Sequence, residues 1–191
     1  MSEEFKKEEE EKVMFDKNRR YCTLDEELIE LFIEQIAHEL YNKNLYLMFS
    51  NYYDTEGLYL MAKYYKARAE EEDNHHKWIL EYLSYCDIEF SYPEVKSVQL
   101  YIKDRNHPLL ATIDREIVTT IKINHIVDKA IELKDWQTFN WLMGNGPVDG
   151  NLVTEQSEEE NLSRAVADIC EDDSTPWIIK QEAVIKLYEN E

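Results

Sequence analysis

Turn-forming residues are scarce in this chain, which has only four glycines and four prolines among its 191 residues. Because both residue types punctuate the backbone, this scarcity favours long uninterrupted helices over many short strands. Cysteine is also rare, and Cys22, Cys86 and Cys170 lie far apart and never form a Cys-x-x-Cys pair. Their number and spacing argue against a disulfide framework, a zinc ribbon and a rubredoxin-like iron site.

Positive charge is in short supply, because 21 Lys and Arg residues face 41 Asp and Glu residues and leave a formal charge of −20. Phosphate backbones and anionic membranes should repel such a chain, so we expect no nucleic-acid or membrane partner and favour cations. No apolar run approaches the roughly 20 residues that span a bilayer. The acidic start Met1-Ser2-Glu3-Glu4 does not resemble a signal peptide, and we expect a cytoplasmic protein.

The length of the chain predicts one domain, which we place at residues 23–191 after a charged arm at residues 1–22. We predict an all-α fold, a four-helix bundle with a long crossover and a short fifth C-terminal helix. The first three expected helices run from the cap Thr23 to about Tyr53, from Gly57 to about Tyr85, and from about Leu109 to Lys134. The fourth starts at Trp136 and is best defined over 151–171. The fifth begins at Ser174-Thr175-Pro176, a cap followed by proline at the first helical position, and ends near Tyr188.

Two glutamates occupy helix positions that should face the core. Glu39 lies three residues after Ile36 and seven before Tyr46, and Glu116 lies between Ile113 and Thr120 on another apolar stripe. Two buried, unpaired carboxylates would lose several kcal/mol of hydration each, unless cations or hydrogen bonds compensate. A divalent or trivalent metal ion would compensate both.

The stretch EEEDNHH at residues 70–76 adds a Glu-x-x-His pair, Glu72 and His75, on one face of a helix. Such a run alone is more often a solvated surface. In the fourth helix, TEQSEEE places Gln156 and Glu159 at the same spacing. Bundle di-iron sites combine glutamates from two helices with pairs of this kind from the other two. We therefore predict one ion at Glu39, Glu72 and His75, and a second at Glu72, Glu116 and Glu159 with Gln156 nearby.

Oxygen ligands with a single imidazole suit Fe(II) and Fe(III), although Mn(II) and Zn(II) would also bind such a site. A manganese or mixed-metal oxidase working as a small oligomer is therefore one alternative interpretation.

Five segments resemble those of bacterial non-haem ferritins in the same order: EQIAHELYNKNLY (34–46), AEEEDNHH (69–76), REIVTTIKIN (115–124), DWQTFNWL (135–142) and TEQSEEENL (154–162). The resemblance covers about residues 24–190. It implies a ferritin-like bundle, a 24-subunit shell that stores ferric mineral, and a ferroxidase centre in each subunit that oxidises Fe(II) with O2 or H2O2. Haem is not expected, because Asp73 stands where bacterioferritins carry a haem-ligating Met.

The resemblance also implies roles for residues around the two ions. Tyr46 would be the tyrosine beside the centre and a candidate electron donor. A third iron site on the cavity side would use Glu71, Glu155 and Glu158, with Glu159 shared. The remaining members of the charged run, Glu70, Asp73 and His76, are interpreted as surface residues.

The chain departs from that family at GNGPVDG, residues 144–150, which interrupts the fourth helix. Pro147 would remove a helical hydrogen bond, and we expect a looped-out segment with Asn151 as the new cap. The interruption lies shortly before Glu155 and Gln156. It leaves open a non-catalytic shell or interaction subunit with an impaired centre.

Overall fold

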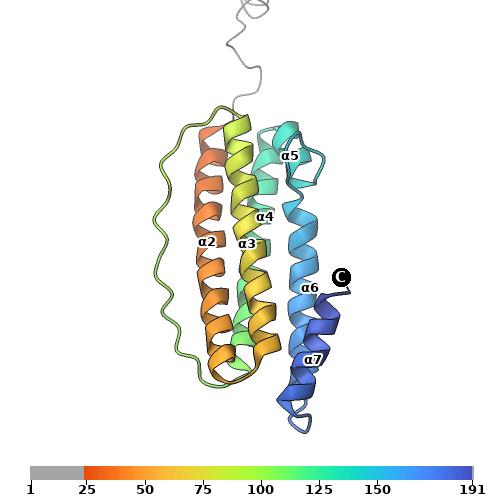
Figure 1. Ribbon diagram of the computed structural model, residues 1–191. Coiled ribbons are helices and arrows are strands. Elements are labelled where there is room, and N and C mark those ends of the chain that lie inside the picture. Colours follow the sequence, from red (N-terminus) through yellow and green to blue (C-terminus); the bar gives the residue numbers. More distant parts are fainter. Residues whose placement is uncertain (1–23, 191) are drawn as a thin grey trace, which may run out of the picture.

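The computed structural model describes residues 24–190, so the predicted arm at 1–22 and the predicted cap Thr23 lie outside the described residues. Within that range the chain is all-α, with no strand, as predicted. The helices are α2 (Glu26–Thr55), α3 (Tyr59–Tyr85), α4 (His107–Glu132), α5 (Trp136–Leu142), α6 (Leu152–Glu171) and α7 (Trp177–Tyr188). Figure 1 shows α2, α3, α4 and α6 as the long members of an upright bundle, with α7 alongside α6.

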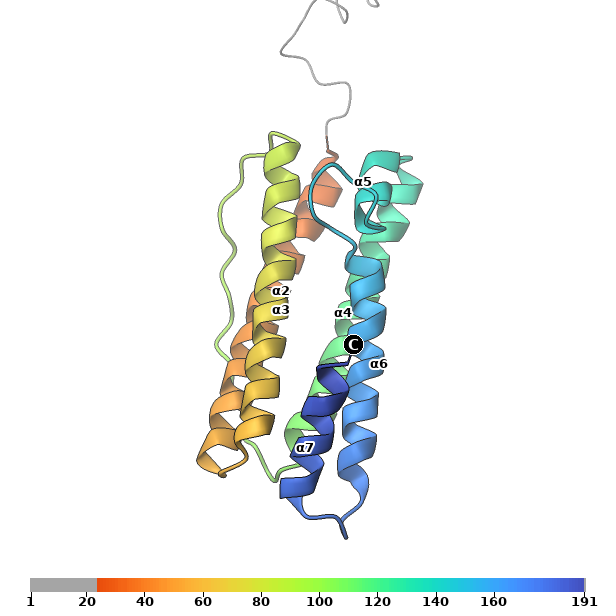
Figure 2. The same ribbon diagram turned by 45° about the vertical axis from the view of Figure 1, so that its right-hand side comes forward.

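A long crossover connects α3 to α4 and confirms the predicted topology. Residues 87–106 contain no helix or strand and run along the outside of the bundle from one end to the other (Figures 1 and 2). The chain therefore enters α4 at the end where α3 began, and these two helices are parallel. Among the helices of residues 24–190, none is long and apolar enough to cross a bilayer.

The first helix starts later than predicted. Its N-cap is Asp25, whose Oδ1 accepts the backbone N–H of Glu27 at 2.9 Å, so the predicted cap at Thr23 was wrong. A carboxylate at this position satisfies one of the free amide groups of the first turn. The second helix also begins later, at Tyr59, because Gly57 has a φ of +75° and belongs to the turn.

The prediction for the last helix was wrong in its cap. Ser174 Oγ donates to both carboxylate oxygens of Asp172, at 2.7 and 2.9 Å, instead of binding the helix. Pro176 occupies the N-cap with φ −59° and ψ 141°, and no side chain caps α7. Proline serves here as the last extended residue, because its missing N–H costs nothing outside the hydrogen-bonded turns.

The interruption of the fourth helix folds back onto Trp141. The indole Nε1 donates to the carbonyl oxygen of Asp149 at 2.7 Å, and a Cβ at Gly150 would lie 2.6 Å from that nitrogen, so only glycine fits. The Trp141 ring stacks on Tyr82 at 4.1 Å between centroids. Asn151 is the N-cap of α6 as predicted, but with φ +83° and without a capping hydrogen bond from its side chain.

The core consists of two hydrophobic clusters, one toward each end of the bundle. The first surrounds Tyr46, Tyr65 and Leu162, and the second surrounds Phe32, Ile79 and Trp141. In each long helix, a short buried polar segment separates residues of one cluster from residues of the other. These polar segments are at the same level and define the candidate site.

Candidate metal centre

Six polar side chains from four helices are buried between the two hydrophobic clusters. Each is no more than 6% exposed. They are Glu39 from α2, Glu72 and His75 from α3, Glu116 from α4, and Gln156 and Glu159 from α6. The helical periodicity that pointed to an inward orientation for these residues was therefore correct.

The ligand-type atoms of these residues form two overlapping groups. Glu39, Glu72 and His75 offer atoms that all lie within 4.8 Å of one another, and so do Glu72, Glu116 and Glu159. Glu72 belongs to both groups. This is the arrangement predicted for two neighbouring ions with a bridging carboxylate, and the role of each residue as a ligand stays a prediction.

Several acceptors in the centre are buried without a hydrogen-bond partner. They include both carboxylate oxygens of Glu72, Oε2 of Glu39, Oε2 of Glu159 and Nδ1 of His75. A buried polar atom left unpaired costs about 1–3 kcal/mol, and more when it is charged. A cation at this position would pair the carboxylate oxygens, so the donor set fits a divalent metal.

Burial controls the protonation of the centre. It raises the pKa of Glu72 well above its ordinary value, and the neighbouring charges of Glu39 and Glu116 raise it further. Burial also raises the pKa of Glu39 and of Glu159. For His75, burial and then the charge of Arg68 lower the pKa to about 3. The imidazole is therefore neutral, which is the form that binds metals.

The carboxylate of Glu116 is held on both sides. Its Oε1 accepts hydrogen bonds from the Tyr46 hydroxyl and from Arg68 Nη2, and its Oε2 accepts one from Gln156 Nε2 at 2.8 Å. Tyr46 is fully buried beside the centre. Gln156 thus positions Glu116 with its amide nitrogen and leaves its own Oε1 without a partner.

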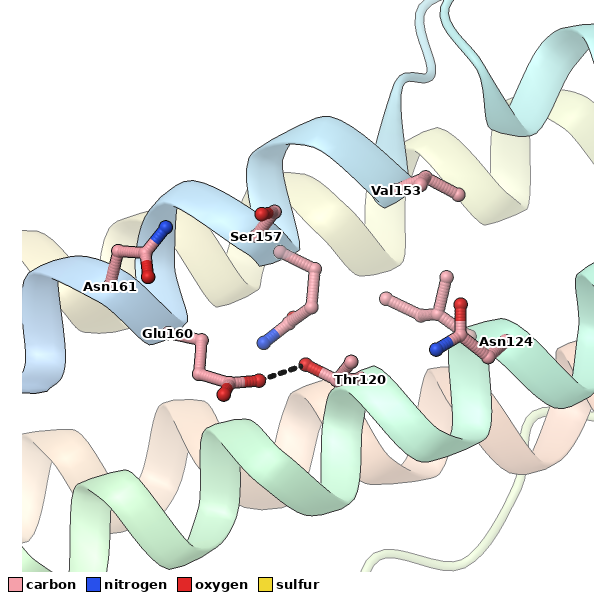
Figure 3. Close-up of a pocket in the computed structure, with 8 residues that line it drawn as sticks. Thr120, Asn124, Val153, Ser157, Glu160 and Asn161 are labelled. Atoms are coloured by element: carbon pink, nitrogen blue, oxygen red, sulfur yellow. Dashed lines mark hydrogen bonds between the residues drawn. The ribbon is translucent and has the colours of Figure 1, made fainter.

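A cavity of about 290 Å³ lies between α4 and α6, and Gln156 is among the residues that line it. Figure 3 shows its lining, with Asn124 and Thr120 on one helix facing Ser157, Glu160 and Asn161 on the other. Thr120 Oγ1 donates to Glu160 Oε2 at 2.8 Å across the cavity. Gln156, which donates to Glu116 in the centre, therefore also borders this cavity.

The residues of the predicted third iron site share a different cavity. Glu71, Glu155, Glu158 and Glu159 all line a space of about 490 Å³, together with Arg68, Leu162 and Tyr188. Among the described residues, this quartet is not one of the groups whose ligand atoms lie within 4.8 Å of one another. The structure brings the four carboxylates to one cavity without preforming a tight ion site.

The outer part of the charged run on α3 differs from its prediction at one residue. Glu70 is exposed as expected, and Asp73 is 23% exposed and pairs with Lys43 and Lys77, each at 2.5 Å. His76 is only 6% exposed, so its interpretation as a surface residue was wrong. A helix packed between neighbouring helices buries more of its circumference than one apolar stripe. His76 lies at the edge of the buried face of α3, with Nδ1 3.5 Å from Asp73 Oδ1.

One residue of the site was missed in the sequence. Arg68 is 1% exposed and contacts Glu71, Glu116 and Glu159. The signal was present, because Arg68 lies four residues before Glu72 and seven before His75, on the same face of one helix. A cation is unexpected among prospective metal ligands, so side-chain chemistry alone does not predict an arginine in the centre.

Comparison with known proteins agrees with this geometry. The family model of the ferritin-like domain matches residues 29–170. A bacterial non-heme ferritin from Campylobacter jejuni is 33% identical over 145 residues, which are 76% of this chain and 83% of that protein. A probable bacterial non-heme ferritin-like protein from Haemophilus influenzae is 30% identical over 145 residues, 76% of this chain and 84% of that protein.

Solved structures give the same result for the fold. A ferritin from Chlorobium tepidum matches with a TM-score of 0.73 and 26% identity, over 88% of this chain and 96% of its own. An open pore ferritin from Archaeoglobus fulgidus matches with a TM-score of 0.77 and 21% identity, over 85% of this chain and 98% of its own. With a buried carboxylate and histidine centre in a matching bundle, and a family model that covers most of its length, this chain belongs to the ferritin family.

Proposed function

We propose that this protein is an iron-storage ferritin subunit that oxidises Fe(II) at its buried centre and delivers Fe(III) for deposition as ferric mineral. The observation that carries the proposal is the pair of overlapping ligand groups joined by Glu72, with carboxylate oxygens that lack partners. Two Fe(II) ions are the substrate, one at Glu39, Glu72 and His75, and the other at Glu72, Glu116 and Glu159.

The reaction needs two electrons from two neighbouring ions. Two Fe(II) and O2 with two protons give two Fe(III) and H2O2, or two Fe(II) and H2O2 with two protons give two Fe(III) and two waters. The protein contributes proximity of the two one-electron donors and anionic ligands that favour the higher charge of Fe(III). Reduction of O2 beyond H2O2 takes further electrons, and the Tyr46 phenol, whose hydroxyl donates to Glu116 beside the second group, is the proposed donor of one of them.

The assembly and the cellular location of this subunit are inferred from its family. Relatives over most of the chain are named bacterial non-heme ferritins, and we infer a 24-subunit shell and a cytoplasmic location from that likeness. The formal charge of −20 would attract Fe(II) to the shell and repel nucleic acid.

The position of Gln156 and Glu159 favours a catalytic subunit over a non-catalytic one. The loop between α5 and α6 closes on Trp141, and α6 begins again at Leu152, one turn before Gln156. Gln156 and Glu159 are 2% and 6% exposed, beside Glu116 and His75. The interruption is therefore accommodated outside the ligand groups.

The test is stopped-flow oxidation of Fe(II) under air, followed by ferric absorbance beside a protein-free control. We expect a fast phase that saturates near two irons per chain, as in bundle di-iron proteins. Glu72→Ala should abolish the fast phase while leaving assembly intact, and the exposed neighbour variant Glu70→Ala should retain it. A wild-type trace equal to the protein-free control would support the non-catalytic shell, and wild-type kinetics in Glu72→Ala would refute the assigned centre.

A further inference from the structure

Arg68 is a buried cation that the oxidation chemistry does not require. Its side chain is 1% exposed, among the largest fully buried side chains of the described residues. It lies on the face of α3 that carries Glu72 and His75. A guanidinium is always charged and donates through a rigid planar fork, so it can hold several carboxylates at once.

The fork of Arg68 is directed at the second ligand group. Nη2 lies 2.9 Å from Glu116 Oε1, and Nη1 lies 3.2 Å from Glu159 Oε1. Nη1 also lies 2.6 Å from Glu71 Oε2, at the edge of the neighbouring cavity. Two of the three carboxylates in the Glu72, Glu116 and Glu159 group are thus already paired with a positive charge.

The first ligand group has no such partner. In the described part of the chain, neither Glu39 nor Glu72 forms an ion pair with a lysine or arginine, and Gln35 Nε2 supplies one hydrogen bond to Glu39 Oε1 at 2.6 Å. Both oxygens of Glu72 and Oε2 of Glu39 remain without a partner. An incoming ion therefore meets the unpaired carboxylate oxygens of Glu39 and Glu72 and the imidazole of His75.

The two ions would consequently experience different electrostatic repulsion when they bind. An ion held by Glu116 and Glu159 would lie within a few ångströms of the guanidinium, and like charges at that distance repel strongly in a poorly solvated interior. It would also have to replace the hydrogen bonds that Arg68 makes. The first ion displaces no lysine or arginine side chain.

The cavity beside Arg68 gives the guanidinium a place to move. This space of about 490 Å³ is lined by Arg68 and by the carboxylates of Glu71, Glu155 and Glu158. Tyr188 Oη donates to Glu71 Oε1 at 2.9 Å, which leaves Oε2 of Glu71 directed at Arg68. Arg68 can therefore keep its bond to Glu71 while it releases Glu116 and Glu159.

We propose that Arg68 is a built-in competitor for the second iron and makes the two ion positions unequal. The first ion binds at Glu39, Glu72 and His75, and the second binds when the guanidinium leaves Glu116 and Glu159 for the acidic cavity. Arg68 is a positioning residue that sets the affinity of the second position. This inference rests on the proposed two-iron centre.

The test is a titration of the assembled, metal-free protein with Zn(II), which binds carboxylate and imidazole ligands without redox chemistry. Isothermal calorimetry of the wild type should show two binding steps per chain with dissociation constants at least about tenfold apart. In Arg68→Ala the second step should tighten by at least about tenfold, and the first should change by less than about threefold. Arg164→Ala, which removes an exposed arginine paired with Glu160, should match the wild type.

Thermal unfolding separates competition from a purely structural role. Without metal, Arg68→Ala should melt below the wild type, because Glu71, Glu116 and Glu159 lose their cation. Saturating Zn(II) should raise its melting temperature by more than it raises that of the wild type, and Arg68→Lys, which keeps the charge, should fall between them. A variant too unstable to purify without metal is prepared with Zn(II) and stripped at low temperature.

The outcomes distinguish this inference from the proposed function. Two wild-type steps of equal affinity, or an unchanged second step in Arg68→Ala, would overturn the role of Arg68 and leave the two-ion centre intact. If neither the wild type nor Arg68→Ala binds Zn(II) more tightly than Glu72→Ala does, the proposed centre itself is wrong, and the competition fails with it.

Discussion

Arg68 and Glu116 form an ion pair in the centre of the bundle, with 2.9 Å between Nη2 and Oε1 and side chains that are 1% and 0% exposed. Removing one partner of such a pair strands a buried charge, whereas the intact pair is close to neutral for stability. In the metal-free protein, the positive charge of Arg68 therefore compensates the buried carboxylates of Glu116 and Glu159. At Glu39 and Glu72, a bound metal ion would supply that compensating charge.

The first prediction concerns Glu72 and pH. Because burial and neighbouring carboxylates raise its pKa well above the ordinary 4.5, the folded chain keeps a proton that the unfolded chain releases. The associated stability is complete below pH 4.5 and is lost as the pH rises through the raised pKa. Metal-free Glu72→Gln should escape this loss. We expect its advantage over the wild type to grow from pH 5 to pH 8, to about 1–3 kcal/mol.

Denaturant unfolding of the metal-free proteins at several pH values measures this difference. The low pKa of His75, about 3, is common to both chains to a first approximation and cancels from the comparison. The exposed Glu70→Gln variant should behave as the wild type at every pH. If the difference in unfolding free energy between Glu72→Gln and the wild type is the same at every pH, Glu72 does not titrate with a raised pKa in the folded protein.

The second prediction concerns Tyr46. Tyr46→Phe removes the hydroxyl that donates to Glu116 and leaves the ring packed near Phe49 and Tyr65. Stability should fall by about 0.5–1.5 kcal/mol for the lost hydrogen bond. The number of Zn(II) ions bound should not change, while the fast phase of Fe(II) oxidation slows. Freeze-quench electron paramagnetic resonance should detect a tyrosyl radical in the wild type that the variant lacks; equal rates and spectra would remove Tyr46 from the reaction.

The third prediction concerns the interrupted fourth helix. Trp141→Phe breaks the hydrogen bond to Asp149 and weakens the stack on Tyr82, and neither ring belongs to the two ligand groups. Large-to-smaller changes with a lost buried hydrogen bond cost about 2–3 kcal/mol, which corresponds to a melting temperature lower by about 4–12 °C for a chain of this size. Calorimetry measures that decrease.

In the same variant the fast phase of iron oxidation should keep its amplitude of about two irons per chain. The loop is anchored by Trp141 and not by the ligand groups, so loosening it should leave the centre assembled. A loss of the fast phase without loss of folding would mean that the interruption controls the geometry of the centre.

The fourth prediction concerns the acidic cavity. The double variant Glu155→Gln and Glu158→Gln removes two charges from the space beside Glu71 and leaves the two ligand groups untouched. The fast phase should retain about two irons per chain, and the slower uptake that follows should fall several-fold. Stopped-flow traces at increasing iron ratios measure both phases. If slow uptake is unchanged, the third site is not part of iron transfer.

The amphipathic pattern of the sequence already contained the bundle and most of the centre. Few glycines and prolines predicted long helices, and the 3.6-residue period placed Glu39 and Glu116 on buried stripes. The Glu72 and His75 pair needed only local helical geometry to share a face. These features depend only on the spacing of residues along one helix, so the sequence alone predicts them.

Tertiary structure decided the features that depend on contacts between helices. The predicted cap before Pro176 was wrong because the Ser174 and Thr175 side chains bond Asp172. The burial of His76 depends on what packs beside α3. The loop after Leu142 closes on Trp141, whose indole donates to Asp149 and whose backbone carbonyl accepts from Gly144 and Asn151. The partners of Arg68 come from α3, α4 and α6. A helical period specifies which side chains point inward, but only the packing of the helices determines which charges meet there.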